Sequence, residues 1–249
     1  MEPAGLAVGA LALAGLFNNA VDCFEYVQLG RNFGTNFQTS LLKLDNARLR
    51  LSRWGQAVGL SGDIANAQSL QSTALPTEDI PKAEKLLGQI LELFADAEGV
   101  SAKFKSRASA NDSSLMVLDV QEDMDSVHRS LHEKMRDLSI KRQNRTALHQ
   151  KVKWALYEEK HFRRLIEDVI DLVNGLVETF PAVQQEQREL CEVEVSEIGT
   201  SDGLPILKDI AVSQDKDLEV AILKVLKSKV SMQTQNLPLT THFSLGEWE

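Results

Sequence analysis

The chain has 249 residues, of which 43% are apolar, 25% charged and 6% aromatic, and its net charge at neutral pH is −9. This length fits one large or two small domains, and the balance of apolar and charged residues excludes a wholly disordered or collagen-like chain. Two cysteines, Cys23 and Cys191, are too few for a disulfide-dense secreted scaffold or a four-cysteine zinc site. They suit a reducing cytosol, although one buried disulfide stays open. The acidic charge argues against a dedicated nucleic-acid binder.

The first predicted element is an apolar helix at the amino terminus. Residues 3–21 carry no charge, and the stretch 4–17 reads AGLAVGALALAGLF. As a helix, these residues would span roughly 28 Å, just short of a bilayer core of about 30 Å. The first basic residue is Arg31, so the positive charge that precedes the apolar run of a secretory signal is missing. A signal peptide is therefore the weaker interpretation.

Three interpretations of this apolar segment stay open. It is a helix buried in the core of a soluble protein, a permanent membrane anchor, or a helix buried at rest and inserted into a membrane after a trigger. Gly5 and Gly9 form a GxxxG pair and Gly15 follows, so helices could pack closely through this face in a membrane. The same pair also arises often by chance, and a helix that is apolar on all sides is typical of a core.

Further helices are predicted along the chain. Apolar residues recur at helical spacing over 37–58, and a polar connection follows at 65–79. Residues of this connection can cap a second helix, with Pro81 in its first turn and Gly99 beyond its end. Residues 99–114 are rich in Ser, Ala and Lys and predict a loop.

The second half of the chain is also predicted to be helical. Residues 120–175 contain no proline and few turn signals, which indicates one or two long helices. Another helix is expected to begin near Pro181, and a last one runs through residues 221–226 after a turn. Residues 230–249 are polar and unpatterned and predict a loose tail. No alternating strand and no repeat is visible, so the predicted fold class is an all-α single domain.

Charge is distributed unevenly over this half. Between His128 and Arg164 there are 11 Lys or Arg against four Asp or Glu, and from Glu167 to Glu219 there are 14 acids against three basic residues. These stretches are either solvated helix faces, or the basic one contacts anionic lipid, where each cation would contribute on the order of 1 kcal/mol. Nucleic acid is not predicted, because the aromatic residues that it often stacks on are sparse. The candidate lipid-contacting residues are Lys141, Arg142, Arg145, Lys151 and Lys153.

Catalytic signatures are missing from the sequence. It contains no phosphate-binding loop, dinucleotide fingerprint, nucleophile elbow or HExxH motif. His128 and His132 lie four residues apart with Glu133 beside them, but no third metal ligand is evident, and surface histidines are the favoured interpretation. Cys23 has no neighbouring cation and reads as a structural thiol. We therefore predict no enzyme, no catalytic residue, no metal and no cofactor.

Several motifs resemble one family. The stretch LFNNAVDCFEYVQLGRNFG at 16–34 closely resembles the HeLo domain of fungal heterokaryon-incompatibility proteins. Matches continue in order with RLSRWGQAV at 50–58, VHRSLHEKMRDL at 127–138, WALY at 154–157 and LPILKDIA at 204–211. The resemblance covers residues 1–229, which defines a predicted HeLo domain followed by the tail at 230–249.

The resemblance implies a cell-death effector. HeLo domains are helical bundles with a buried apolar amino-terminal helix, which is released to perforate a membrane when a neighbouring amyloid-forming region assembles. Carried onto this chain, the membrane-active helix is 1–22, and at rest its apolar side chains should be covered by other helices. The implied insertion segment consists of Gly5, Leu6, Val8, Gly9, Leu11, Leu13, Gly15, Leu16 and Phe17.

The resemblance also implies partners. We expect a homo-oligomer, dimeric at rest, that lies in the cytoplasm and joins membrane lipids when triggered. The prion-bearing members carry paired Asn/Val-rich repeats after the domain, whereas residues 231–249 show none. Either a separate amyloid-forming partner supplies the trigger, or the chain is a regulator, or it has kept the fold and lost the toxicity. The missing repeats also resemble a family relative linked to loss of pathogenicity. The alternative is a soluble helical interaction module whose first helix never leaves the core.

Overall fold

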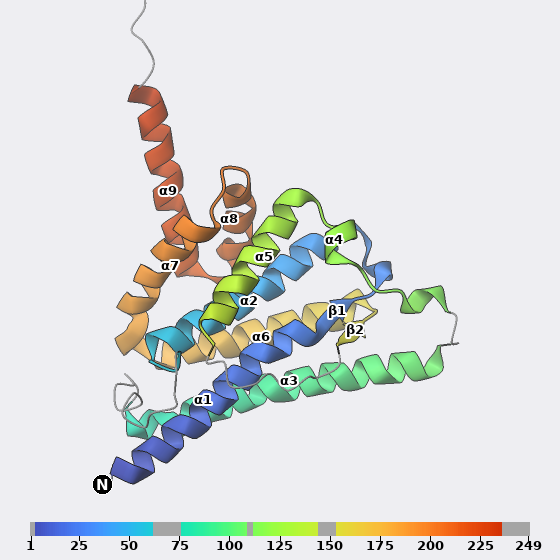
Figure 1. Cartoon of the computed structure of the whole chain (residues 1–249), viewed down its shortest axis with the longest axis horizontal. Helices are drawn as coiled ribbons and strands as arrows, with labels where there is room; N and C mark the ends of the chain where they lie inside the picture. The colour runs from blue at the N-terminus through green and yellow to red at the C-terminus, as the bar shows by residue number, and fades with distance from the viewer. Residues whose placement is uncertain (1–2, 62–75, 109–111, 144–152, 236–249) are drawn as a thin grey trace, which may run out of the picture.

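A computed structural model describes residues 3–61, 76–108, 112–143 and 153–235, which form one helical bundle (Figure 1). The all-α prediction is confirmed. Its helices and strands are α1 (Pro3–Tyr26), β1 (Val27–Leu29), α2 (Phe37–Ala57), α3 (Ile80–Arg107), α4 (Val120–Asp123), α5 (Ser126–Lys141), β2 (Trp154–Leu156), α6 (Glu159–Thr179), α7 (Gln184–Ile198), α8 (Gly203–Gln214) and α9 (Lys216–Gln235). Short 3-10 turns lie at Arg31–Asn36, Thr77–Asp79, Ser113–Leu115 and Pro181–Val183.

Helix α2 is the centre of the bundle. It packs against α1 and α6 on one side and against α5, α7 and α8 on the other. Most of its side chains are buried, including the polar Asp45, Arg48 and Arg53. A helix buried on all sides must find internal partners for such groups, because water is not available to them.

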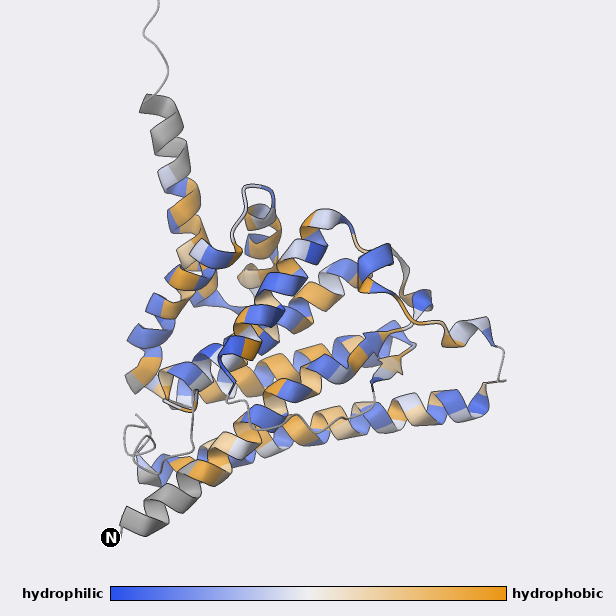
Figure 2. Ribbon diagram, viewed as in Figure 1, coloured by the Kyte–Doolittle hydropathy of each residue, from blue (hydrophilic) through white to orange (hydrophobic). Residues whose placement is uncertain are grey.

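The apolar residues fall into two clusters that share α2. One cluster joins side chains of α1, β1, α2, α3, β2 and α6, and the other joins α2, α5, α7, α8 and α9. Figure 2 shows apolar and polar residues alternating along these helices. Helix α1 therefore belongs to one half of the core only, and its release would leave the second cluster covered.

A buried ion cluster joins α2 to the carboxy-terminal helices. The guanidinium of Arg53 donates from Nη2 to Glu194 at 2.7 Å and to Asp215 at 2.8 Å. Arg142, which follows α5, donates to the same Glu194. The two carboxylates and the Arg53 side chain are almost completely inaccessible to solvent. Ion pairing offsets the free energy that is needed to bury these charges. A single buried charge without its partners would destabilise the fold.

The structure corrects four expectations about local structure. WALY at 154–157 supplies β2, which pairs in parallel with β1 in the register Val27↔Trp154, so this pair breaks the expected long helix. Helix α3 continues through the predicted loop as far as Arg107. A separate helix α8 precedes α9, and α9 extends to Gln235, beyond the predicted start of the tail at residue 230.

Candidate functional site: the seat of the N-terminal helix

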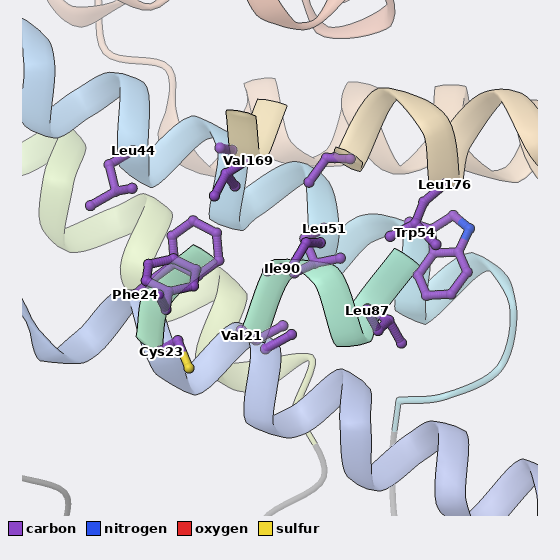
Figure 3. Packing of buried hydrophobic residues seen from close by; sticks show 14 of the residues in the cluster. Val21, Cys23, Phe24, Leu44, Leu51, Trp54, Leu87, Ile90, Val169 and Leu176 are labelled. Atoms are coloured by element: carbon purple, nitrogen blue, oxygen red, sulfur yellow. The ribbon is translucent and has the colours of Figure 1, made fainter. Parts of the chain in front are cut away.

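Helix α1 lies on the outside of the bundle, packed along α3 and across α2 (Figure 1). We call the surfaces of α2 and α3 that it covers the α1 seat. Phe24 meets Phe94 of α3 edge-on, with 4.9 Å between ring centroids, and Phe17 meets Trp54 of α2 at 6.4 Å. Figure 3 shows Val21 and Phe24 of α1 among buried side chains of the neighbouring helices. Burial of such aromatic and aliphatic groups is what holds the helix in water.

Over residues 11–19 of α1 only one face is covered, whereas none of residues 20–26 is exposed. Leu13 and Phe17 are fully buried, as expected, but Leu16 is half-buried and Gly15 is exposed. The prediction that Leu11 is covered is wrong, since 45% of it is accessible to solvent. Leu11 lies on the face of α1 that is turned away from the seat. The side chains of the four other predicted insertion residues, Gly5, Leu6, Val8 and Gly9, lie outside the described part.

One glycine of the seat permits the close approach of α1. A Cβ atom added to Gly55 of α2 would lie only 2.2 Å from Cε2 and Cζ of Phe17. At Gly15 of α1, by contrast, an added Cβ atom would meet nothing within 4 Å. Gly55 is therefore required by the resting packing of α1, whereas Gly15 is not.

The last turn of α1 is held by ions. The carboxylate of Glu25 accepts hydrogen bonds from Nε of Arg136 on α5 at 2.8 and 3.0 Å, and from Nη1 of Arg48 on α2. We call these three residues the Glu25 cluster. Burial raises the pKa of Glu25, but the charge of Arg48 and the hydrogen bonds from both guanidinium groups outweigh burial. The pKa of Glu25 therefore lies below its ordinary value, and the carboxylate is charged at neutral pH.

A second polar contact holds α1 one turn earlier. The side-chain amide of Gln143, just after α5, donates to Asp22 at 2.6 Å and to the backbone carbonyl of Asn18 at 3.3 Å. The carboxyl-terminal half of α1 is thus tied to α2 and α5 by polar groups and to α3 by apolar ones.

A cleft of about 710 Å³ opens beside the Glu25 cluster. Its lining includes all three residues of the cluster, together with Asp45 and His132. Nδ1 of His132 lies 2.7 Å from Asp45. Burial lowers the pKa of His132, but the charge and hydrogen bond of Asp45 raise it more, so the pKa lies above its ordinary value. Two ion pairs between helices therefore face one cleft.

His128 and His132 lie beside two different carboxylates. His132 faces Asp45, His128 lies beside Asp125 at the start of α5, and Glu133 accepts from the Gln121 amide at 3.0 Å. No group of three or more metal-ligating side chains occurs among the residues that the structure describes. His132 is mostly buried, so its prediction as a surface residue is wrong. Burial of the ring is offset by its bond to Asp45.

The two cysteines occupy different halves of the core. Cys23 is buried on α1 and Cys191 on α7, and neither takes part in a disulfide. Burial raises the pKa of the Cys191 thiol strongly. Burial also agrees with a structural thiol at Cys23.

Only part of the predicted basic face is exposed to solvent. Lys141 and Lys153 are exposed. The prediction that Arg142 contacts lipid is wrong, because its side chain is buried in an ion pair with Glu194. Arg145 and Lys151 lie outside the described residues.

Among the residues that could be described, none of the helices is both long and apolar enough to cross a bilayer.

The sequence of this helical bundle, with its apolar helix docked on the outside, matches the model of a known family. The family model HeLo, described as prion-inhibition and propagation, matches residues 5–207, and the chain belongs to this family. Heterokaryon incompatibility protein s of Podospora anserina is 39% identical over 210 residues, which cover 84% of this chain and 70% of that protein. Heterokaryon incompatibility protein S of Podospora anserina is 38% identical over 210 residues, with the same shares of both chains covered.

Solved structures agree with this assignment. The structure of the HET-s N-terminal domain has a TM-score of 0.76 and 37% identity, covering 88% of this chain and 98% of the solved one. A mutant form of that domain has a TM-score of 0.76 and 36% identity, with 86% and 98% covered. The predicted HeLo-type fold is therefore confirmed.

The Glu25 cluster and Gly55 were missed by the sequence interpretation. A signal for them is present: Arg48 and Arg53 interrupt a helix whose apolar residues lie on several sides, so buried cations could have been predicted there. Their partners could not, because Glu25, Glu194 and Asp215 lie far away in sequence.

Proposed function

We propose that this chain is a non-catalytic HeLo-domain effector of the incompatibility type, whose α1 leaves its seat on oligomerisation and enters a membrane. The observation that carries this proposal is the docking of α1. It lies on the outside of the bundle, and the exposed side of its described part is free of charge, with Leu11 and Gly15 among its residues. Its release would leave the second apolar cluster covered, because no described side chain of α1 belongs to that cluster.

The free energy of docking α1 is large enough that its release requires a trigger. Release would expose Leu13, Phe17, Val21 and Phe24, each worth about 1.5–3 kcal/mol when buried. The sum of roughly 6–12 kcal/mol is comparable with the whole stability of an ordinary domain, so α1 stays docked in water. Lipid would replace the lost apolar contacts, and association of several copies would cover the groups that a single helix leaves exposed.

The expected partners follow from this scheme. Copies of the chain form a homo-oligomer, dimeric at rest, and a separate amyloid-forming protein brings more copies together. The related proteins named for heterokaryon incompatibility support this role. The protein lies in the cytoplasm at rest and at a membrane when triggered. The exposed Lys141 and Lys153 are available to anionic lipid.

The alternative is a soluble helical interaction module. It would keep α1 docked under every condition and bind a protein partner through its surface. The partly buried polar contacts at Glu25 and Gln143 favour stable docking, so this alternative must be tested by experiment.

The test is dye leakage from anionic liposomes, with the full chain fused at its carboxy terminus to an inducible oligomerising module. The decisive variant is the double substitution Leu11→Glu and Gly15→Glu. Both positions are exposed at rest, so the resting fold should tolerate the carboxylates. In a bilayer each charge would cost about 2.5–3.5 kcal/mol, so insertion should fail. A matched control places Glu at exposed positions of two other helices, Val193→Glu on α7 and Val212→Glu on α8.

Leakage by the oligomerised chain and by the control, but not by the double variant, would support the proposal. Equal leakage by the double variant would exclude α1 as the membrane-active segment. Absence of leakage, with folding and oligomerisation verified, would overturn the proposal in favour of the interaction module.

A further inference from the structure

Helix α1 supplies the counter-charge of a buried cation. Arg48 of α2 is 2% accessible to solvent, and its Nη1 donates to Glu25 in the last turn of α1. Its Nε and Nη2 atoms are buried, and no described residue hydrogen-bonds to them. Among the described residues, Glu25 is therefore the one group that compensates Arg48.

Arg136 depends much less on α1. Its side chain is 42% accessible to solvent, and Nη1 also lies 3.8 Å from Asp137. If Glu25 lost its charge or moved away, Arg136 would turn to water or to Asp137. Arg48 has no such alternative, because it is buried and no other described residue hydrogen-bonds to it. Without Glu25, its guanidinium would carry the full cost of desolvation. The docking of α1 and the burial of Arg48 are thus coupled.

We propose that Glu25 is the positioning residue that keeps α1 docked, and that its protonation from the adjacent cleft favours release of α1. This inference deepens the proposed function and rests on it for the role of release. It adds a site of control to that function: a proton takes the place of Arg48 as the partner of the Glu25 carboxylate. No other chemical step is involved.

The surroundings of Glu25 determine the direction of the pH effect. Cations and carboxylates reach the cleft from α2, from α5 and from the segments before α4 and before β2. The charged or titratable residues that line it besides Glu25 are Asp45, Arg48, Asp119, His132, Glu133, Arg136, Asp137 and Lys153. Because the pKa of Glu25 is lowered in the folded chain, its stabilising contribution is complete above the ordinary value of about 4.3 and is lost as pH falls through the lowered value.

The two buried cysteines allow release of α1 to be measured separately from unfolding. Cys23 lies on α1, and Cys191 lies in the other half of the core. The full chain is treated with a thiol reagent that reacts at acid pH, and the labelled cysteine is located by mass spectrometry. At each pH, rates are divided by those of the urea-unfolded chain, which removes the intrinsic pH dependence of the reagent.

The variants separate the charge of Glu25 from its bulk. Glu25→Gln should raise the labelling rate of Cys23 by roughly 100-fold at pH 7 and leave Cys191 protected, because it strands the buried guanidinium. Adding Arg48→Met should bring the rate most of the way back, since an apolar side chain needs no counter-charge. Glu25→Asp keeps the negative charge and should therefore protect Cys23 better than Glu25→Gln does, although less well than the wild type. Glu197→Gln, at an exposed position of α7, is the matched control and should behave like the wild type.

The pH profile is the second readout. In the wild type, the labelling rate of Cys23 should rise relative to that of Cys191 as pH falls below about 4.3, and Glu25→Gln should abolish most of this rise. The inference is overturned if Glu25→Gln labels like the wild type, if both cysteines become reactive together, or if Arg48→Met gives no rescue. Exposure of Cys23 without liposome leakage would leave the Glu25 inference standing and refute the membrane role. Leakage that is insensitive to Glu25 would do the reverse.

Discussion

Gly55 of α2 lies directly under the ring of Phe17, and substitution by alanine is the most direct perturbation of the α1 seat. The added Cβ atom would lie 2.2 Å from two ring carbons, more than 1 Å inside an ordinary contact of 3.4 Å. The ring cannot swing aside freely, because Phe17 is fully buried and packs on Trp54, which in turn packs on Phe180. Either α1 moves outward or the aromatic group rearranges.

The expected cost follows from this geometry. Overpacking of a core by one methyl group typically costs 1–3 kcal/mol, and complete loss of a buried Phe side chain about 3–5 kcal/mol. For Gly55→Ala we expect about 3 kcal/mol, since the clash involves a pinned aromatic ring. In a domain of this size, that free energy lowers Tm by roughly 6–12 °C.

The assay combines thermal unfolding with thiol labelling. Gly55→Ala should lower Tm and raise the labelling of Cys23 more than that of Cys191, because the strain lies at the seat. Gly15→Ala is the matched control: it meets no atom within 4 Å and should keep or slightly raise stability. Combining Gly55→Ala with Phe17→Leu should recover part of the loss. A wild-type Tm and labelling pattern in Gly55→Ala would refute the reasoning.

Two further predictions concern the ion pairs. Arg53→Met leaves the carboxylates of Glu194 and Asp215 without their main buried partner. Urea unfolding should therefore show that the free energy of unfolding falls by about 3–5 kcal/mol. A loss below about 1 kcal/mol would contradict the assigned burial. His132 has a raised pKa in the folded chain through Asp45, so the stability it contributes is complete below its ordinary pKa of about 6.5 and is lost as pH rises through the raised value. The urea midpoint of the wild type should therefore fall relative to that of His132→Gln between pH 6 and pH 8, and parallel midpoints would disprove the contribution.

The sequence alone predicts much of the secondary structure, and the reasons are local. The helix at 37–58 and the helix that begins near Pro81 follow from apolar spacing and from the fixed backbone of proline, which depend on nearby residues. The short β1–β2 pair was not predictable in this way. Its three-residue strands come from positions more than 120 residues apart, and such short segments become strands only when tertiary packing brings them together.

The chemical role of charged residues was also beyond a local interpretation. Arg142 belongs to a basic stretch that looks solvated, yet its side chain is buried on Glu194 of α7. Which charges are internal depends on which helices meet, and helix periodicity does not specify that.

The sequence by itself determined the class of fold, the family through its motifs, and the uncharged character of residues 3–21. Only the tertiary structure decided which face of α1 is covered, that Gly55 must lack a side chain, and that Glu25 neutralises a buried cation. The physical reason is that helix formation and apolarity are properties of short segments, whereas burial, steric fit and desolvation depend on what lies across the interface.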